Sequence, residues 1–443
     1  MEIKYFKIVI CGGGSTYTAG IVKDLLDEKR LGIKELWLYD IDAERQDKVA
    51  YLVQEVINEK RPGTVLKKTT DPAEAFTDAD FIMAQMRVGG LPMRVKDEQT
   101  SLKHGVIGQE TVGPGGMAYG MRTIPKMIEL IDYCEKYAKP TYWIVNYSNP
   151  AAIVAKATTE LRPNARIINI CDMPVEIEER MAEILNCDLS DIEVDYFGLN
   201  HFGWYTHVRC KGVDVTDKLK DYVRQNGYIA NNGRAGSLLQ DPDWVHTFKT
   251  SAKIARYFTD YLPNTYYQYY LLGDDMYKYM DINNTRGMQV INGREKRVFA
   301  AAEKLKNGEK VDMNQFYVGV HGAFIVRVVT SLAYDLRCRE LVMVRNNGCI
   351  ENLSDDAMVE VPAYITDRGP EPVRVGPIPR FYKGLIEQQD ACEGLIVEAV
   401  SEGSYEKALQ AFTLNRTIPS ANKAKEILDD MIEVNKGYWS DLK

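Results

Sequence analysis

The chain has 443 residues, a hydrophobic fraction of 45% and a charged fraction of 27%, which are typical of a soluble globular protein with more than one lobe. Its formal net charge is −8 and no basic tract accumulates, which argues against nucleic acid as a partner. No apolar run reaches membrane-spanning length, and residues 1–4 lack the apolar core of a signal peptide. The eight cysteines are scattered, so we expect reduced thiols in a cytoplasmic protein that binds no membrane.

The first predicted elements are a strand at 7–11, a glycine turn, a helix at 18–26 and a second strand at 35–40. This order predicts a dinucleotide site, because glycines let the backbone approach a pyrophosphate and the helix offers free N–H groups to it. A carboxylate at the end of the second strand would hold the adenosine ribose and repel a 2′-phosphate, which favours NAD over NADP. The expected cofactor residues are Gly12, Gly13, Gly14, Ser15, Thr16 and Asp40.

This glycine pattern is imperfect, since Tyr17 stands where a third glycine is usual. A glycine cluster alone more often marks a tight turn than a cofactor loop. It is the strand, the helix and Asp40 in register that favour dinucleotide binding.

Strands and helices continue to alternate to about residue 198, which predicts a parallel, doubly wound sheet. The glycine-rich segment 105–116 is expected to be a loop. The other predicted elements are helices at 43–60, 71–76, 119–137 and 175–185, and strands at 81–86, 141–145 and 167–170.

Polar side chains follow the predicted strands at their carboxyl ends, where ligands bind in open α/β sheets. Asn149 follows the strand at 141–145, and Cys171 and Asp172 separate the strand at 167–170 from the next helix. With His201 downstream, a thiol, a carboxyl and an imidazole could form a metal site with an acid beside it. Spacing alone favours a small buried cysteine and a core histidine over a metal site, because no short ligand-pair motif is present.

The pattern changes near residue 198, so we expect a Rossmann-like NAD-binding domain at 1–198 and a mixed α+β domain at 199–443. Alternation at 204–210 and 213–215 predicts a hairpin. Helices are expected at 384–400, 404–414 and 420–435, where apolar faces could supply an oligomer interface.

Several other residues have two possible roles. The segment 262–270 holds four tyrosines, which usually pack in a core, although one beside a cation could act as a base. Arg94 and Arg286 could form bidentate contacts with a phosphate, although an isolated arginine is usually ion-paired. Glu360 is a polar residue in an apolar setting, and its role stays open, as does that of Glu110.

Six motifs occur in one order along the chain. They are Cys-Gly-Gly-Gly-Ser at 11–15, Gly-Gln-Glu-Thr at 108–111, Asn-Tyr-Ser-Asn-Pro at 146–150, Cys-Asp-Met-Pro at 171–174, Gly-Leu-Asn-His at 198–201 and Pro-Asn-Thr-Tyr at 263–266. Together they resemble glycoside hydrolase family 4, the NAD- and metal-dependent glycosidases, from about residue 5 to the carboxyl end. The Cys-Asp-Met-Pro motif resembles the 6-phospho-α-glucosidase branch, since the 6-phospho-β-glucosidases have Cys-Asn followed by an aliphatic residue and proline.

The resemblance implies a lactate and malate dehydrogenase-like amino-terminal lobe and hydrolysis of 6-phospho-α-D-glucosides, such as maltose 6′-phosphate. It implies oxidation at C3 by NAD, proton removal at C2, elimination, water addition and re-reduction. The roles that it implies are metal ligands, usually of Mn²⁺, for Cys171 and His201, acid for Asp172, base for Tyr266, and substrate contacts for Arg94, Asn149 and Arg286.

Other activities remain possible at this point. A 6-phospho-β-glucosidase or another α-glycosidase of the family shares the same motifs. A plain NAD-dependent dehydrogenase shares the first lobe but would accumulate NADH, and a nucleotide-sensing protein would not need an acid, a base and a metal together. We expect a homodimer or a homotetramer that takes a phosphorylated disaccharide as its substrate.

Overall fold

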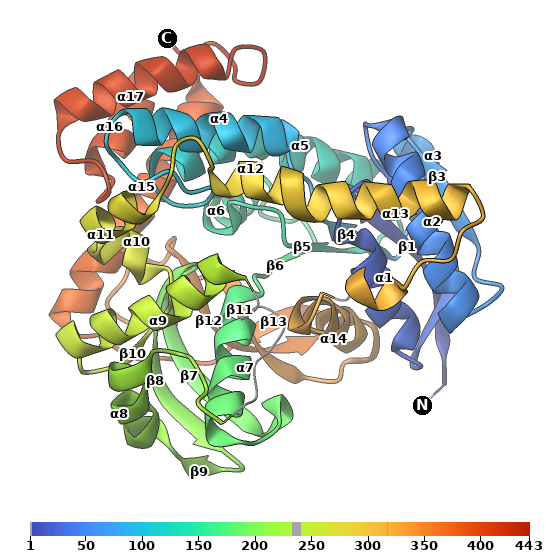
Figure 1. Ribbon diagram of the computed structural model, residues 1–443, viewed down its shortest axis with the longest axis horizontal. Helices are drawn as coiled ribbons and strands as arrows, with labels where there is room; N and C mark the ends of the chain where they lie inside the picture. The colour runs from blue at the N-terminus through green and yellow to red at the C-terminus, as the bar shows by residue number, and fades with distance from the viewer. Residues whose placement is uncertain (1, 233–240, 317) are drawn as a thin grey trace.

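The computed structural model describes residues 2–232, 241–316 and 318–443. A nine-stranded sheet runs through it in the order β13-β12-β11-β6-β5-β4-β1-β2-β3 (Figure 1). The first six strands in the chain pair in parallel, which confirms the doubly wound sheet. They are β1 (Lys4–Cys11), β2 (Leu31–Tyr39), β3 (Leu66–Thr69), β4 (Phe81–Ala84), β5 (Trp143–Asn146) and β6 (Ile167–Asn169).

The strand order reverses between β1 and β4, because the chain runs outward through β2 and β3 and then returns to β4. Ligands bind outside the carboxyl ends of the strands at such a point. The helices of this half are α1 (Thr18–Asp27), α2 (Ala43–Lys60), α3 (Pro72–Phe76), α4 (Gly90–Lys103), α5 (Gly113–Tyr137), α6 (Ala151–Leu161) and α7 (Met173–Leu185).

Local signals explain why α2 has the predicted bounds. Asp42 caps its first turn by accepting a hydrogen bond from the backbone N–H of Arg45. Val49, Val53 and Val56 are buried at helical spacing and turn one face toward the sheet.

The structure corrects two expectations in this half. The predicted loop at 105–116 is wrong from Gly113 onward, because α5 begins there and its glycines lie close to the preceding loop: a Cβ on Gly116 would lie 2.4 Å from the carbonyl oxygen of Thr111. Helix α4 was missed because its buried face carries charged side chains, among them Arg94, Asp97 and Glu98, which mask the apolar periodicity.

Three strands from the second half extend the same sheet. β11 (Cys338–Arg345) joins β6 in antiparallel fashion through the single pair Met343 and Asn169, and β12 (Met358–Thr366) and β13 (Gly369–Pro372) follow. Ile8 and Val342 therefore belong to one apolar core, although they come from opposite halves of the chain.

A second sheet contains β7 (Ile192–Leu199), β8 (Phe202–Cys210), β9 (Val213–Asp214) and β10 (Leu262–Pro263). Pairing of β8 with β9 confirms the predicted hairpin. The parallel alternation ends before β7 and not at about residue 198, because the two residues between β7 and β8 permit only an antiparallel connection. The domain division at 198 stays a prediction.

Helices α15 (Arg380–Glu402), α16 (Tyr405–Leu414) and α17 (Ala421–Val434) confirm the three helices predicted near the end of the chain, and they lie beside α4, α5 and α6 (Figure 1). Within the described ranges, no helix is both long and apolar enough to cross a bilayer. The remaining helices are α8 (Thr216–Asn226), α9 (Pro242–Tyr257), α10 (Tyr267–Leu271), α11 (Gly273–Tyr279), α12 (Arg286–Val290), α13 (Lys296–Lys306) and α14 (Val320–Tyr334).

Candidate active site

The glycine turn between β1 and α1 is fastened to the end of β2. The backbone N–H groups of Gly12 and Gly13 donate to the carbonyl oxygen of Tyr39 at 2.9 and 3.0 Å. The N–H of Gly14 donates to Oδ2 of Asp40 at 2.8 Å. Burial raises the pKa of Asp40, and backbone hydrogen bonds oppose the shift. Asp40, which we expect to bind the adenosine ribose, therefore contacts the glycine turn directly.

The turn has no space for side chains at its glycines. Gly12 has a φ of 86°, and a Cβ on it would lie 2.8 Å from the carbonyl oxygen of Gln85. A Cβ on Gly14 would lie 2.9 Å from Cγ of Arg45. Ser15 and Thr16 complete the turn before α1 begins. These contacts keep the turn tight, and a tight glycine turn between a strand and a helix is part of a dinucleotide site.

Tyr17, at the position of the usual third glycine, makes contacts that sequence reasoning missed. Its ring lies 3.8 Å from the guanidinium carbon of Arg294, and its centroid is 5.3 Å from that of His321. The departure from the glycine pattern was the only sequence signal for these contacts.

Cys171 and His201 come together at the carboxyl edge of the sheet. Sγ of Cys171, between β6 and α7, lies 3.2 Å from Nε2 of His201. His201 has a φ of 61° in the tight turn between β7 and β8, and this turn aims its ring at the cysteine. Both side chains are buried. Burial raises the pKa of the Cys171 thiol and lowers that of His201 to about 4, so the imidazole is neutral near pH 7.

The hydroxyl of Thr111 sets the tautomer of His201. Oγ1 of Thr111 donates to Oε1 of Gln109 at 3.0 Å and lies 3.2 Å from Nδ1 of His201. Since the hydroxyl proton is given to Gln109, Oγ1 accepts from Nδ1–H, and the lone pair of Nε2 faces Cys171. The motif at 108–111 therefore orients the imidazole of His201 through the ring nitrogen that does not face Cys171.

Glu360 supports the cysteine in a similar way. Oε1 of Glu360 accepts a hydrogen bond from Nδ2 of Asn200 at 2.9 Å, and the side chain of Asn200 also bonds to Cys171. Burial raises the pKa of Glu360 to about 7. Glu360 is therefore linked to the candidate metal ligand Cys171 through Asn200.

Asp172 and Tyr266 flank this pair. Oδ2 of Asp172 lies 2.7 Å from Nδ1 of His321. Burial alone would raise the pKa of Asp172, but the charge and hydrogen bond of His321 outweigh it and lower the pKa. The ring of Tyr266 stacks on His201, and burial raises the pKa of its phenol.

Arg94 is buried and paired with two carboxylates. Its Nε lies 2.8 Å from Oε1 of Glu98, and its Nη1 lies 3.0 Å from Oε2 of Glu110. Glu110 also accepts a hydrogen bond from Arg87 at 2.6 Å. Burial would raise the pKa of Glu110, but the two guanidinium groups lower it to about 2. Sequence reasoning missed Arg87 and left Glu110 without a role.

Arg286 opens α12 and is paired with Asp241 and Asp243, at 2.6 and 3.2 Å. Glu98 joins this helix to Arg94, because its Oε2 accepts a hydrogen bond from the backbone N–H of Gly287 at 2.8 Å. The two predicted arginines thus belong to one connected region, and each is neutralised by carboxylates.

Asn149 precedes a cis peptide bond to Pro150 and lies at the carboxyl end of β5. Its half-buried side chain shares this loop with Tyr147, whose ring packs edge-on against His321 at 5.7 Å. Asn149 therefore lies on the loop that contributes a ring contact to His321, the partner of Asp172.

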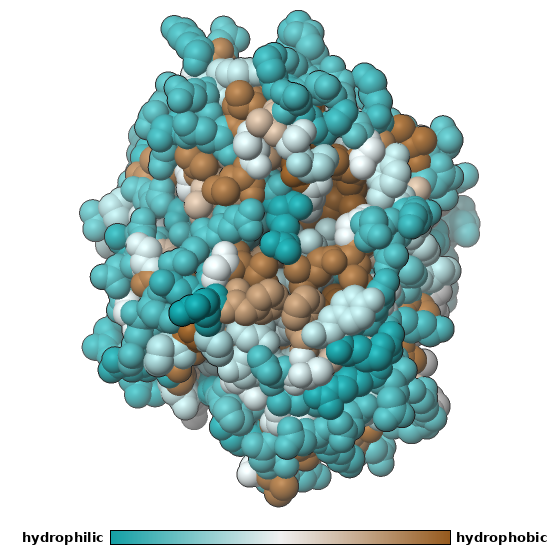
Figure 2. Space-filling view, turned by 90° about the vertical axis from the view of Figure 1, so that its left-hand side faces the viewer, coloured by the Kyte–Doolittle hydropathy of each residue, from teal (hydrophilic) through white to brown (hydrophobic). Residues whose placement is uncertain are grey.

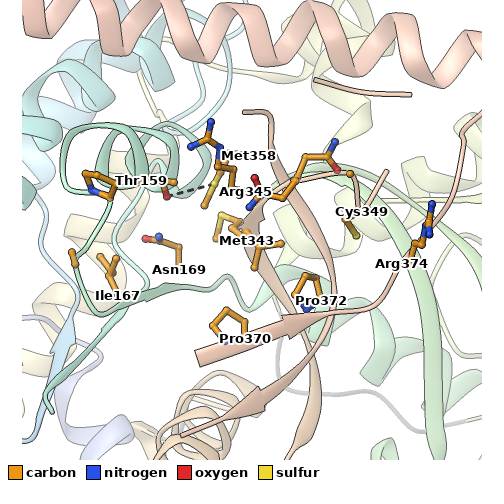
Figure 3. Close-up of a pocket in the computed structure, with 16 residues that line it drawn as sticks. Thr159, Ile167, Asn169, Met343, Arg345, Cys349, Met358, Pro370, Pro372 and Arg374 are labelled. Atoms are coloured by element: carbon orange, nitrogen blue, oxygen red, sulfur yellow. Dashed lines mark hydrogen bonds between the residues drawn. The ribbon is translucent and has the colours of Figure 1, made fainter. Parts of the chain in front are cut away.

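A pocket of about 660 Å³ lies elsewhere, where β6 and β11 diverge (Figure 3). Met343, Met358 and Pro370 contribute an apolar lining, and Arg345 and Arg374 contribute charge. None of the candidate catalytic or metal-binding residues lines it. Across residues 2–232, 241–316 and 318–443, no group of three or more His, Cys, Asp and Glu side chains is arranged to hold a metal ion.

Two family models match the chain. Family 4 glycosyl hydrolase matches residues 7–187, and the family 4 glycosyl hydrolase C-terminal domain matches residues 196–418. The chain belongs to glycosyl hydrolase family 4. This family 4 chain is 48% identical to maltose-6′-phosphate glucosidase of Bacillus subtilis (strain 168), over 100% of this chain and 98% of that protein.

Solved structures of the family are also similar. A 6-phospho-α-glucosidase from gut microorganisms, in complex with NAD and glucose 6-phosphate, is 73% identical with a TM-score of 0.98, over 99% of the family 4 chain and 100% of the other. A second 6-phospho-α-glucosidase from gut microorganisms, in complex with NAD and Mn²⁺, is 44% identical with a TM-score of 0.93 over the same shares.

More distant relatives bear on the branch and on the fold. The 6-phospho-β-glucosidase BglT of Thermotoga maritima is 30% identical, over 98% of the family 4 chain and 99% of BglT. A lactate dehydrogenase from Eimeria maxima is 16% identical, covers 91% of the chain and 97% of its own length, and has a TM-score of 0.50. That likeness concerns the fold alone and confirms the expected dehydrogenase-like architecture.

Proposed function

We propose that this chain is a 6-phospho-α-glucosidase that hydrolyses substrates such as maltose 6′-phosphate to glucose 6-phosphate and an aglycone, with NAD and a divalent metal ion, Mn²⁺, as cofactors. One observation carries the proposal: Cys171 and His201 meet with Asp172 and Tyr266 beside them, in a chain whose full-length relatives carry this activity in their names.

The residues present fit both cofactors. The turn at Gly12 and Gly14 packs tightly against Gln85 and Arg45, as the tight glycine turn of a dinucleotide site does, and Asp40 suits the ribose of NAD. Sγ of Cys171 and Nε2 of His201 converge from two elements, and Thr111 holds the histidine tautomer that leaves Nε2 free to bind a metal ion.

The reaction proceeds by steps that the side chains of this site can serve. When bound, NAD⁺ would accept a hydride from C3 and later return it, and the metal ion would polarise the C3 carbonyl. With C3 oxidised, the proton on C2 is acidic, and Tyr266 removes it. Asp172 protonates the glycosidic oxygen as it leaves C1. Water then adds across the C1–C2 double bond, with its oxygen on C1 and a proton returned to C2, and C3 is reduced again, so hydrolysis occurs with no net redox change.

Arg94, Asn149 and Arg286 contact the phosphorylated sugar in this proposal. The arginines are paired with carboxylates in the structure, so a phosphate must compete with Glu110 near Arg94 and with Asp241 and Asp243 near Arg286. Two planar guanidinium groups give bidentate geometry that suits a phosphate.

The α branch is favoured by Asp172, which supplies a carboxyl where the β branch has an asparagine. We place the enzyme in the cytoplasm, because a phosphorylated sugar, NAD and eight free cysteines are all suited to that compartment. A homodimer or homotetramer is in keeping with the apolar side chains that gather on the side where α9, α15 and α16 lie (Figure 2).

The test is a panel of p-nitrophenyl α- and β-glucosides, each with and without a 6-phosphate, assayed with NAD⁺ and Mn²⁺. Hydrolysis confined to the 6-phospho-α-glucoside supports the proposal. Preference for the β anomer or for unphosphorylated sugars contradicts the substrate, and NADH that accumulates in step with product contradicts the redox-neutral route in favour of a dehydrogenase.

A further inference from the structure

His321, in the first turn of α14, lies within hydrogen-bond distance of the candidate acid. Its Nδ1 lies 2.7 Å from Oδ2 of Asp172. The imidazole lies between two aromatic rings, with centroids 5.3 Å away in Tyr17 and 5.7 Å away in Tyr147. The first ring comes from the glycine turn and the second from the loop after β5, so three segments besides α14 meet at this histidine.

The start of α14 is held in place by its glycines. A Cβ on Gly322 would lie 2.1 Å from Oδ2 of Asp24, so α14 approaches α1 as closely as a glycine allows. Gly319 precedes the helix with a φ of 60°. The backbone of His321 is therefore fixed against the same helix that follows the glycine turn.

Asp172 is turned toward this histidine and away from its own helix. It occupies the N-cap of α7, where an aspartate usually accepts a hydrogen bond from a backbone N–H of the first turn. Here its carboxylate makes no capping bond. Oδ2 faces His321, and Oδ1 lies on the side of Cys171, 3.9 Å from its Sγ.

We propose that His321 is a positioning residue for Asp172: by donating Nδ1–H to Oδ2, it orients the carboxyl group so that a proton carried on Oδ1 faces the leaving oxygen. This inference rests on the proposed function and deepens it. Rotation of a carboxyl about its last torsion has a broad, roughly twofold profile, so a single directed hydrogen bond selects one oxygen for the reaction. The rings of Tyr17 and Tyr147 keep the donor from turning away.

A purely structural ion pair would behave differently. Loss of structure lowers activity on every substrate, whereas loss of orientation at the acid matters most when the leaving oxygen needs a proton. An alkyl leaving group, such as the glucose of maltose 6′-phosphate, needs that proton, and p-nitrophenolate needs little help.

The experiment compares His321→Phe with His321→Asn in the full-length enzyme with NAD⁺ and Mn²⁺. Phenylalanine keeps a ring between Tyr17 and Tyr147 but has no donor. Asparagine loses the ring but has an amide N–H near the place of Nδ1. We expect His321→Phe to lower kcat on maltose 6′-phosphate by about 10- to 100-fold and on p-nitrophenyl α-glucoside 6-phosphate by about threefold or less, with KM nearly unchanged. We expect His321→Asn to recover most of the difference.

The control is His207→Phe, which changes an exposed histidine on β8 and is expected to leave both rates unchanged. Equal losses on both substrates, or equal behaviour of His321→Phe and His321→Asn, would overturn the inference. If His321→Phe does not fold, His321→Leu replaces it in the comparison with asparagine. A wild-type enzyme inactive on both substrates contradicts the proposed function itself, whereas an active wild type with leaving-group-independent variants contradicts only the role of His321.

Discussion

The ring of Tyr266 stacks on the imidazole of His201, with 3.9 Å between centroids and 22° between planes. These residues are contributed by the turn after β7 and by the segment after β10, and the contact ties the proposed base to a proposed metal ligand. Because burial raises the pKa of Tyr266, a cation beside the ring is needed to favour its phenolate near pH 7.

The first prediction separates base from acid. Tyr266→Phe removes the group that takes the C2 proton, so we expect a loss of about 10²- to 10⁴-fold in kcat on every substrate. Asp172→Asn should cause a loss of that size on maltose 6′-phosphate and a far smaller one on p-nitrophenyl α-glucoside 6-phosphate. Steady-state rates on the two substrates check both expectations. Equal losses for Asp172→Asn would mean that Asp172 orients the sugar or the metal ion instead.

The second prediction concerns metal binding. Cys171→Ser and His201→Ala should lose bound Mn²⁺, measured by elemental analysis after dialysis. Thr111→Val keeps the shape of the side chain but removes the acceptor for Nδ1–H of His201, so we expect metal affinity to fall by about 10- to 100-fold.

Thr123→Val is the matched control for the metal experiment. It removes a buried hydroxyl that donates to the carbonyl oxygens of Tyr119, at 2.8 Å, and Asn149, at 3.4 Å, and neither acceptor belongs to the pair of candidate metal ligands. Unchanged Mn²⁺ binding in Thr111→Val would show that the hydroxyl does not support His201 as a metal ligand. Full metal content in both Cys171→Ser and His201→Ala would show that these two residues have only a packing role.

The third prediction concerns the glycine turn. Gly12→Ala places a Cβ 2.8 Å from the carbonyl oxygen of Gln85 at a φ of 86°, so the turn must move and NAD⁺ affinity should fall about tenfold or more. Gly63→Ala is the control, because Gly63 has a similar φ of 93° but open space around it. Titration of intrinsic fluorescence with NAD⁺ measures both. Equal affinities for the two variants would refute a cofactor role for the turn.

The fourth prediction concerns the arginines. Arg94→Lys and Arg286→Lys keep the charge but lose the planar fork, so each should raise KM for the phosphorylated substrate about tenfold. Arg162→Lys serves as the control, because Arg162 forms a comparable fork to Asp132 at the surface, at 2.7 and 2.9 Å. If unphosphorylated maltose is hydrolysed as well as maltose 6′-phosphate, the arginines need another explanation.

The fifth prediction concerns stability. Glu393 is 2% exposed, its Oε1 accepts a hydrogen bond from Gln389, and burial raises its pKa to about 8. In the folded protein Glu393 keeps its proton up to about pH 8, whereas in the unfolded chain it releases the proton near pH 4.5. The contribution of Glu393 to the free energy of unfolding is therefore complete below pH 4.5 and is lost as the pH rises to about 8. We expect Glu393→Gln to be more stable than wild type at pH 8 by about 1–3 kcal/mol, and much less so at pH 5.

Urea unfolding at both pH values measures this difference, with Glu402→Gln as the control, since Glu402 is exposed at the end of the same helix. A stability difference that does not change with pH would contradict the shift assigned to Glu393.

The sequence by itself determined the elements whose signals are local. Helix α2 was predictable from its cap at Asp42 and its buried stripe, and the βαβ order from the glycine turn and the apolar strands. Cys171, Asp172 and Asn149 were predictable as site residues, because the carboxyl ends of parallel strands meet at one edge.

Only the tertiary structure decided the features that depend on pairing between distant segments. The addition of β11, β12 and β13 to the first sheet leaves no periodic trace, since each strand looks the same whichever strand it pairs with. Helix α4 was hidden because its charges are buried by partners such as Glu110, which lie outside the helix. His321 and Thr111 became visible when α14 and the loop before α5 were placed beside Asp172 and His201, because a hydrogen bond between residues 90 to 149 positions apart is a property of the fold and has no local pattern.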